Sequence, residues 1–262
     1  MTRQNYYAAR KYRQRREVDE ALIVELARRE RQMQPRMGGR KLLHLLRADL
    51  QEAGVNVGRD RFFEVLAAHD LLVPHKPGVP HTTNSRHSLP VFHNLLAGKT
   101  WNRPNQAWAS DLTYIRTAEG FLYAALITDV YSRKIVGFHI GDSLEAEGCV
   151  QALNVALREL PADKHPIHHS DRGCQYCCGD YITRLEARGL PISMTQILHC
   201  YENALAERLN GILKQEYEMD QTFRTKAQAR KAFEQAVWFY NYRRPHTALN
   251  FRFPADVHAE AA

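Results

Sequence analysis

Proline sets the strongest limit on what the middle of this chain can form. Five of the eleven prolines fall between Val73 and Pro104, scattered among His, Asn, Ser and Thr residues. Because proline fixes φ and has no N–H to donate, neither a regular helix nor a central strand can run through this spacing. We therefore expect residues 74–104 to form a linker or extended arm between an N-terminal region, 1–73, and a larger domain, 105–262.

Apolar residues recur at helical spacing three times before this arm. The pattern predicts helices over residues 17–33, 40–54 and 59–72, the second of which ends at Gly54. The expected apolar stripes are Val18, Ala21, Leu22 and Leu26; Leu42, Leu46 and Leu50; and Phe62, Phe63 and Leu66. The second and third helices have the form of a helix-turn-helix, in which Arg59 and Arg61 would contact DNA. An ordinary helical hairpin explains the same pattern at least as well.

The larger domain alternates between strand-like and helix-like segments. Strands are expected over residues 105–116, 121–130, 134–141, 166–171 and 191–195, and helices over 145–160, 178–189, 203–217 and part of 227–246. Three consecutive strands followed by alternating helices and strands predict an α/β domain, with helices covering the faces of one sheet.

Three acidic residues of this domain stand in different local settings. Asp111 lies within an expected strand, Asp171 at the end of another, and Glu207 in the middle of an expected helix. Carboxylates gathered at one place repel one another, so such a cluster is favourable only around cations. A pair of Mg²⁺ ions held in this way would carry out phosphodiester chemistry on a nucleic acid.

Other readings of these acids remain open. Asp129 and Asp142 follow strands and suit turn positions, where Asp bonds to its own backbone, whereas mid-strand Asp111 has no such local role. The helix around Glu207 has an apolar stripe and an opposite polar face, which could simply be solvated. The stripe is Leu205, Leu209, Ile212 and Leu213, and the polar face is Asn203, Glu207, Asn210 and Lys214.

The formal net charge of +7 suits a polyanionic partner. The first sixteen residues contain six Lys or Arg residues and no acid, interleaved with tyrosines, which indicates phosphate contact, although a solvated helix face is the simpler explanation. No apolar run is long enough to cross a membrane, and the basic N-terminus lacks the apolar segment of a secretory signal.

Five cysteines in a chain of this length favour reduced thiols in the cytoplasm. Cys174 and Cys177 form a CxxC pair that, with Cys200, His168 and His169, could contribute to a zinc site. No second pair completes such a site in the sequence. A zinc-stabilised interaction protein therefore stands as one alternative.

Several strings occur in a characteristic order. WASDLTYI, DVYSRKIVGF, HHSDRGCQY, CYENALAERLNGILKQE and FYNYRRPHTAL resemble successive signatures of the bacterial insertion-sequence transposases of the IS3 family. The likeness is to the second-frame product of that family, OrfB, and runs from roughly Trp101 to Pro254. The N-terminal string GGRKLLHLLRADLQEAGVNVGRDRFFEVLAAHDLLVP resembles the family's helix-turn-helix element.

The resemblance implies an RNase H-like fold, as in an integrase catalytic core, with a mixed sheet flanked by helices. It implies that Asp111, Asp171 and Glu207 are catalytic and bind two Mg²⁺ ions, which Mn²⁺ can replace. It further implies that Lys214 and Asn203 contact the DNA of the element's ends. The sequence departs from the family pattern at Glu202, which replaces an aspartate, and at Cys174, which replaces a serine.

The implied activity is cleavage at insertion-sequence ends followed by transfer of the new 3′-OH. The implied partners are double-stranded DNA of the terminal repeats and target, further copies of the chain in a homo-oligomer on DNA, and the first-frame product, OrfA, separate or fused. The implied location is the bacterial cytoplasm, at the nucleoid. Two alternatives remain: an RNase H-like nuclease that cuts without joining, and a DNA-binding regulator derived from a transposase.

Overall fold

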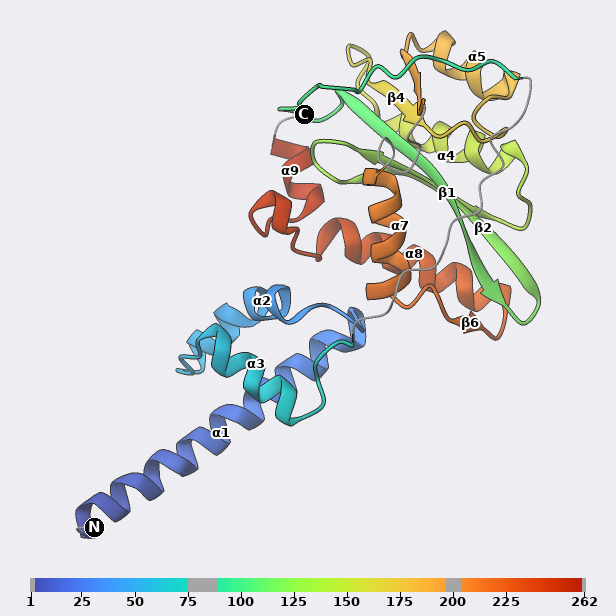
Figure 1. Cartoon of the computed structure of the whole chain (residues 1–262). Coiled ribbons are helices and arrows are strands. Elements are labelled where there is room, and N and C mark those ends of the chain that lie inside the picture. The colour runs from blue at the N-terminus through green and yellow to red at the C-terminus, as the bar shows by residue number, and fades with distance from the viewer. Residues whose placement is uncertain (1–2, 75–88, 197–203, 261–262) are drawn as a thin grey trace. The chain divides into compact units, whose positions relative to one another are not determined.

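The chain forms two compact units. The computed structural model describes residues 3–74, 89–196 and 204–260 and separates a unit of Met1–Lys76 from a unit of Pro77–Ala262 (Figure 1). Within the described ranges, no helix is long and apolar enough to span a membrane.

The first unit consists of helices α1 (Arg3–Met33), α2 (Gly39–Glu52) and α3 (Arg59–Ala68). Leu42, Leu46 and Leu50 of α2 are buried as the apolar pattern predicts, and α2 stops just before Gly54, whose φ of +73° is a conformation that favours glycine. The helical character of this region is therefore confirmed.

The apolar stripe expected on the first helix was partly wrong. Val18 is 69% exposed and Ala21 is exposed as well. Leu26 is buried as expected and Leu22 packs partly buried on the same cluster, whereas the other buried positions, Ile23, Val24 and Ala27, were not in the expected stripe. The cause is that α1 begins at Arg3, well before residue 17, so its N-terminal half extends past α2 and α3 and has no apolar surface to cover it (Figure 1).

The second unit is built on one mixed sheet. Its strands are β1 (Ala107–Thr117), β2 (Gly120–Asp129), β3 (Ile135–Gly141), β4 (Ile167–Ser170), β5 (Ile192–Met194) and β6 (Thr222–Phe223). The strand order is β3-β2-β1-β4-β5, and β6 pairs with the far end of β1. β1, β2 and β3 form an antiparallel meander, whereas β4 lies parallel to β1 and β5 parallel to β4.

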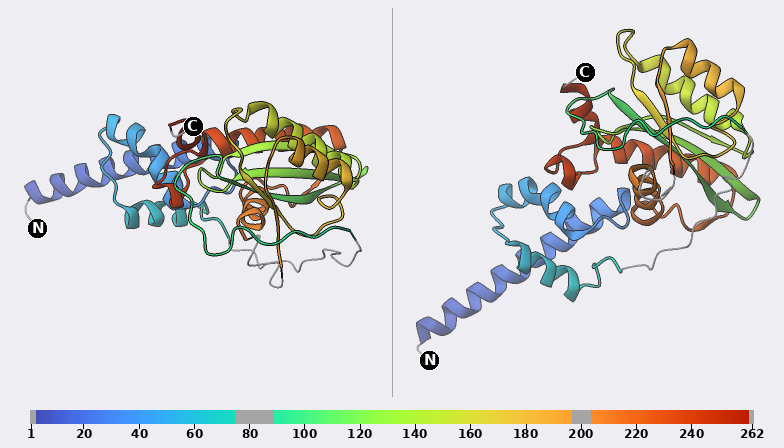
Figure 2. Two further views of the ribbon diagram at one scale, coloured as in Figure 1. Left: turned by 90° about the horizontal axis from the view of Figure 1, so that it is seen from above. Right: turned by 45° about the horizontal axis from the view of Figure 1, so that its top comes forward.

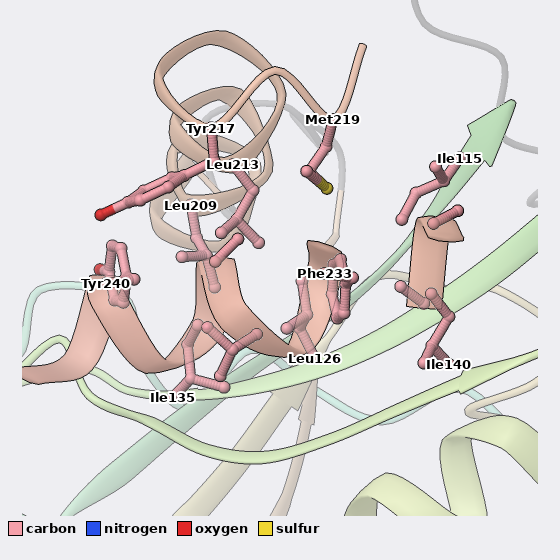
Figure 3. Close-up of a cluster of buried hydrophobic side chains, with 14 of the residues drawn as sticks. Ile115, Leu126, Ile135, Ile140, Leu209, Leu213, Tyr217, Met219, Phe233 and Tyr240 are labelled. Carbon is pink, nitrogen blue, oxygen red and sulfur yellow. The ribbon is translucent and has the colours of Figure 1, made fainter. Parts of the chain in front are cut away.

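Helices cover both faces of this sheet (Figures 1 and 2). One face carries α4 (Ala146–Glu159) and α5 (Gly179–Ala187), whose apolar sides pack on Trp108 and Ile127. The other carries α7 (Ala204–Glu216) and α8 (Lys226–Tyr242). In Figure 3, Leu209 and Leu213 of α7 meet Phe233 and Tyr240 of α8 above Leu126 and Ile135 of the sheet. This three-layer α/β arrangement confirms the expected fold class.

Three short elements were not predicted. They are β6, the 3-10 helix η1 (Thr247–Leu249) and α9 (Pro254–Glu260). Residues 89–104, the described part of the proline-rich segment, contain no helix or strand.

Gly137 of β3 should be intolerant of any side chain. A Cβ there would lie 2.4 Å from the backbone oxygen of Ala152 and 2.8 Å from Cβ of Ala156, both on α4. We expect Gly137→Ala to lower the free energy of unfolding by about 1–3 kcal/mol through overpacking, measured by urea denaturation. Gly179→Ala is the matched control, because nothing lies within 4 Å of its Cβ. Equal stability of the two variants would contradict this reading of the β3–α4 contact.

Candidate active site

The pairing of β1 with β4 places two of the three predicted acids side by side. Ala107 pairs with Ile167, and Ala109 with His169, so the parallel register has a constant offset of 60 positions. The same offset carried two residues further relates Asp111 to Asp171. Neighbouring strands lie about 4.8 Å apart, so Asp171, the first residue after β4, lies near Asp111.

Asp111 is the centre of this arrangement. Its Oδ1 accepts a hydrogen bond from the backbone N–H of Leu112 at 2.9 Å, and its Oδ2 accepts one from Nδ2 of Asn210 at 2.6 Å. Burial, followed by repulsion from Asp171 and from Glu207, raises the pKa of Asp111 to about 7, although both hydrogen bonds act in the opposite direction. The carboxyl groups of Asp171 and Glu207 are therefore close enough to Asp111 to oppose its ionisation.

Asp171 follows the last residue of β4, where the chain turns sharply. Its Oδ1 accepts a hydrogen bond from the backbone N–H of Gly173 at 2.9 Å, which fixes the carboxylate at the turn. A Cβ on Gly173 would lie 3.0 Å from that same oxygen. Glycine thus leaves the carboxylate room that any other residue would take.

Helix α7 brings the third acid to the edge of β1. Its apolar face is buried through Ala206, Leu209, Ile212 and Leu213. The opposite face presents Glu207, Asn210 and Lys214, one helical turn apart. Because Asn210 bonds to Asp111, Glu207 one turn earlier lies beside the same carboxylate. The sequence pattern placed Asn210 on this face but gave no sign that it bonds to Asp111.

The donor set fits divalent cations in its chemistry. Three carboxylates drawn together are an arrangement that Mg²⁺ or Mn²⁺ would stabilise, since both prefer oxygen ligands. Over the described ranges, however, no three His, Cys, Asp or Glu side chains are arranged to hold a metal ion as they stand. The amide of Asn210 donates into the cluster instead, which partly offsets the negative charge.

Asp129 has the turn role that the sequence allowed, whereas Asp142 is held by ion pairs with α8. Asp129 is fully buried, and its oxygens accept hydrogen bonds from the backbone N–H groups of Asn105 and Ser132 at 2.8 and 2.7 Å. Asp142 is 2.8 Å from Nζ of Lys226 in an exposed ion pair. These two carboxylates are therefore occupied by structural contacts.

The histidines of the suggested zinc cluster belong to the interior. Nε2 of His168 lies 2.7 Å from Oγ of Ser110 and 2.8 Å from the hydroxyl of Tyr181, and burial lowers the pKa of His168 to about 3. Nδ1 of His169 lies 2.8 Å from Oγ of Ser193. Both imidazoles thus have hydroxyl partners within the fold, which leaves the zinc alternative without observed support.

The thiols of that cluster do not share one environment. Cys174 is exposed, whereas Cys177 is buried with its Sγ 3.8 Å from Sδ of Met194. Cys200 lies outside the described residues, as does Asn203, one of the predicted DNA contacts.

The remaining predicted DNA contacts occupy separate units. Lys214 places its Nζ 4.7 Å from the ring centroid of Tyr114 on β1. In the helical unit, Arg59 pairs with Asp60 at 2.7 Å and both are exposed. Arg61 pairs with Glu20 at 2.6 Å and with Glu64 at 3.2 Å. Two carboxylates compete for Arg61, so Arg59 is the more available of the two for phosphate.

Comparisons with known proteins agree with this architecture. The integrase core domain family matches residues 102–200 and again residues 188–254. A chain from the intasome of simian T-cell lymphotropic virus superposes with a TM-score of 0.52 at 16% identity, covering 85% of this chain and 70% of that one. The fold and the site therefore define a protein with an RNase H-like integrase core.

Two relatives narrow the class. A 31 kDa protein of insertion element IS600 from Shigella sonnei is 38% identical over 244 residues, which is 92% of this chain and 88% of that protein. The transposase InsF of insertion sequence IS3A from Escherichia coli is 40% identical over 131 residues, which is half of this chain and 46% of InsF. The chain belongs to the IS3 family of insertion-sequence transposases.

The raised pKa of Asp111 has a measurable consequence for stability. A carboxyl group with a folded pKa near 7 binds its proton more tightly when folded than when unfolded, so the protein loses stability as the pH rises from about 4 to about 7. Asp111→Asn cannot ionise. Without divalent ions at pH 8 it should melt roughly 2–8 °C above the wild type, and this advantage should disappear near pH 4.

The matched control is Asp163→Asn, because Lys164 lowers the pKa of the exposed Asp163. That variant should show no increase in Tm at pH 8. If the Tm of the wild type instead rose between pH 5 and pH 7 relative to that of Asp111→Asn, the pKa of Asp111 would not be raised in the folded protein.

Proposed function

We propose that this chain cleaves DNA at the ends of its insertion sequence and joins the resulting 3′-OH to a second phosphodiester, with Asp111, Asp171 and Glu207 as the catalytic carboxylates. The observation that carries this proposal is the raised pKa of Asp111. Asp171 and Glu207 both contribute to that rise, because their negative charges oppose the ionisation of Asp111. A protein gains nothing in stability from such a cluster. The loss of stability that the cluster causes is explained if the three carboxylates serve to bind divalent cations next to a phosphate.

The three carboxylates would hold two Mg²⁺ ions, and Mn²⁺ would replace them. When bound, the ions would lower the pKa of the attacking hydroxyl and stabilise charge on the leaving 3′ oxygen. The residues of the chain contribute geometry. β1 would supply Asp111, the turn after β4 would supply Asp171 and α7 would supply Glu207, while the amide of Asn210 donates a hydrogen bond to Asp111.

The joining step distinguishes this proposal from that of a simple nuclease. A 3′-OH and a water molecule present the same kind of nucleophile, so one set of carboxylates serves both cleavage and transfer. Support for transfer comes from the family, since InsF is named as a transposase for an insertion sequence. A DNA-binding regulator would have no need of carboxylates that oppose one another's charge.

The partners follow from this chemistry. Double-stranded DNA of the terminal repeats and of the target is the substrate, with Lys214, Asn203, Arg59 and Arg61 as contacts to it. Joining two ends requires more than one copy, so the active form is a homo-oligomer on DNA in the bacterial cytoplasm, at the nucleoid. OrfA, separate or fused, contributes to recognition of the ends.

Removing any one carboxylate should abolish cleavage. Asp111→Asn, Asp171→Asn and Glu207→Gln each leave an incomplete ion site, and groups that act as a unit fail singly about as badly as together. We expect loss of Mg²⁺-dependent nicking by at least about 1,000-fold, with DNA binding near normal. The assay supplies the element's own ends and scores nicked and joined products.

Glu186→Gln on α5 is the control, since Glu186 is exposed and lies on a different element from the three acids. Wild-type cleavage by any of the three variants would remove that residue from the site. Cleavage without joining of pre-cut ends would favour the nuclease, and binding without cleavage would favour the regulator.

Lys214 should act on affinity rather than on chemistry. Lys214 is a half-buried residue on the same face of α7 as Glu207, two turns away. Loss of one phosphate contact reduces the slope of log K against log salt concentration by about 0.9. We expect this decrease for Lys214→Ala, measured by fluorescence anisotropy from 50 to 200 mM salt. Lys231→Ala, an exposed lysine of α8, should leave the slope unchanged, and equal slopes for all three proteins would assign Lys214 to a solvated face.

A further inference from the structure

Part of the proline-rich segment is bonded to the outermost strand of the sheet. The backbone N–H of Leu95 donates to Oγ of Ser193 on β5 at 2.8 Å, and Nε2 of Gln196 donates to the carbonyl of Phe92 at 2.9 Å. The ring of Phe92 is also partly buried against the core between the sheet and helices α4 and α5. Residues 92–95 are therefore held on the sheet by polar and apolar contacts together.

The side chain of Asn94 fixes the shape of this stretch. Its Oδ1 accepts a hydrogen bond from the backbone N–H of Leu96 at 2.9 Å and another from that of Ala97 at 3.2 Å. Asparagine commonly stabilises a turn in this way, by bonding to the backbone that follows it. We call residues 92–97 the docked arm.

The end of β5 connects the docked arm to the turn that carries Asp171. β5 has three residues and stands last in the strand order, next to β4. The backbone N–H of Thr195 donates to the carbonyl of Ser170 at 3.1 Å, and Nε of Arg172 donates to the carbonyl of Thr195 at 2.6 Å. Both chain neighbours of Asp171 are therefore bonded to Thr195, and the next residue, Gln196, is bonded to the docked arm.

A second connection runs through the interior of the sheet. Oγ of Ser193, which accepts the bond from Leu95, lies 2.8 Å from Nδ1 of His169. His169 stands on β4, two residues before Asp171, and both Ser193 and His169 are 0% exposed. Water does not compete for hydrogen bonds in such a place, so this connection is stronger than one at the surface.

We propose that the docked arm positions Asp171 for cation binding, by holding β5 and, through Thr195 and Arg172, the turn after β4. This deepens the proposed function and rests on it. Groups that hold a metal ligand in place from behind change metal affinity by about 10- to 100-fold when they are lost. Here the supporting bonds begin in a segment that precedes β1 in the chain, so Asn94 and Gln196 act as positioning residues for a carboxylate that neither of them is shown to touch.

A role limited to covering β5 explains less. Any segment laid along an outermost strand would cover it, wherever the bonds of that segment ended. The bonds of the docked arm instead continue through Gln196 and Thr195 to Arg172, directly after Asp171. A cover alone does not require this series of contacts.

The test measures the affinity of the full chain for Mn²⁺ without DNA, from the enhancement of water proton relaxation. Asn94→Ala removes the acceptor that holds the turn of the docked arm, and Asn94→Asp retains an acceptor there. Gln196→Met keeps the length of the side chain but cannot donate to Phe92. Asp171→Asn gives the affinity without the full carboxylate cluster. The matched control is Asn102→Ala, an exposed residue of the same proline-rich segment.

Asn94→Ala and Gln196→Met should each bind Mn²⁺ about 10-fold more weakly than the wild type, whereas Asn94→Asp and Asn102→Ala should bind it as the wild type does. Far-UV circular dichroism at the assay temperature shows whether each variant is folded. A loss of affinity in a fully folded variant is the result that a purely structural role of the docked arm would not produce.

Wild-type Mn²⁺ affinity in both Asn94→Ala and Gln196→Met would overturn the proposal, and so would an equal loss in Asn102→Ala. The Asp171→Asn variant separates this failure from that of the proposed function. If Asp171→Asn binds Mn²⁺ weakly while both docked-arm variants bind it normally, the docked-arm proposal alone fails. If Asp171→Asn binds Mn²⁺ as the wild type does, the proposed cation site fails as well.

Discussion

The repulsion among three carboxylates is the constraint that the rest of the second unit has to offset. Parallel pairing of β1 with β4 brings the turn that carries Asp171 close to Asp111, and repulsion from Asp171 opposes the ionisation of Asp111. Burial adds to the cost, and the pKa of Asp111 rises to about 7. From helix α7, the amide of Asn210 donates a hydrogen bond to Asp111, and Glu207 adds a further repulsion. The carboxylate cluster therefore lowers the free energy of unfolding, and contacts elsewhere in the unit must compensate for that loss.

That support comes from the apolar side of α7. Leu209 and Leu213 pack against α8, so the polar side of the helix is fixed toward β1. The C-terminal end of α7 is anchored as well, because Nε and Nη2 of buried Arg244 donate to both carboxylate oxygens of Glu216 at 2.8 and 2.9 Å. A paired charge of this kind is strongly destabilising if one partner is removed. Position along α7 is thus set by contacts at some distance from the acids themselves.

The sequence was sufficient for the architecture but not for the contacts between elements. Long periodic runs predicted the meander and its helices. β6 has two residues and α9 is a short helix that begins at Pro254, so neither is long enough to show a periodic apolar pattern. The stripe of α1 was misplaced because several apolar sets fit one helix and tertiary packing decides among them. Residue type and spacing selected Asp111, Asp171 and Glu207. The bond from Asn210 and the cation over Tyr114 depend on how α7 lies along β1, which no local pattern encodes.

Part of the proline-rich segment, residues 92–95, contacts the edge of the sheet. The backbone N–H of Leu95 donates to Oγ of Ser193 on β5, and Nε2 of Gln196 donates to the carbonyl of Phe92. The outermost strand of the sheet is in this way shielded from pairing with foreign chains. A catalytic fragment cut at residue 105 would lose that cover and expose a bare β edge. Where the boundary of a domain is drawn therefore decides whether the isolated core stays dispersed or aggregates.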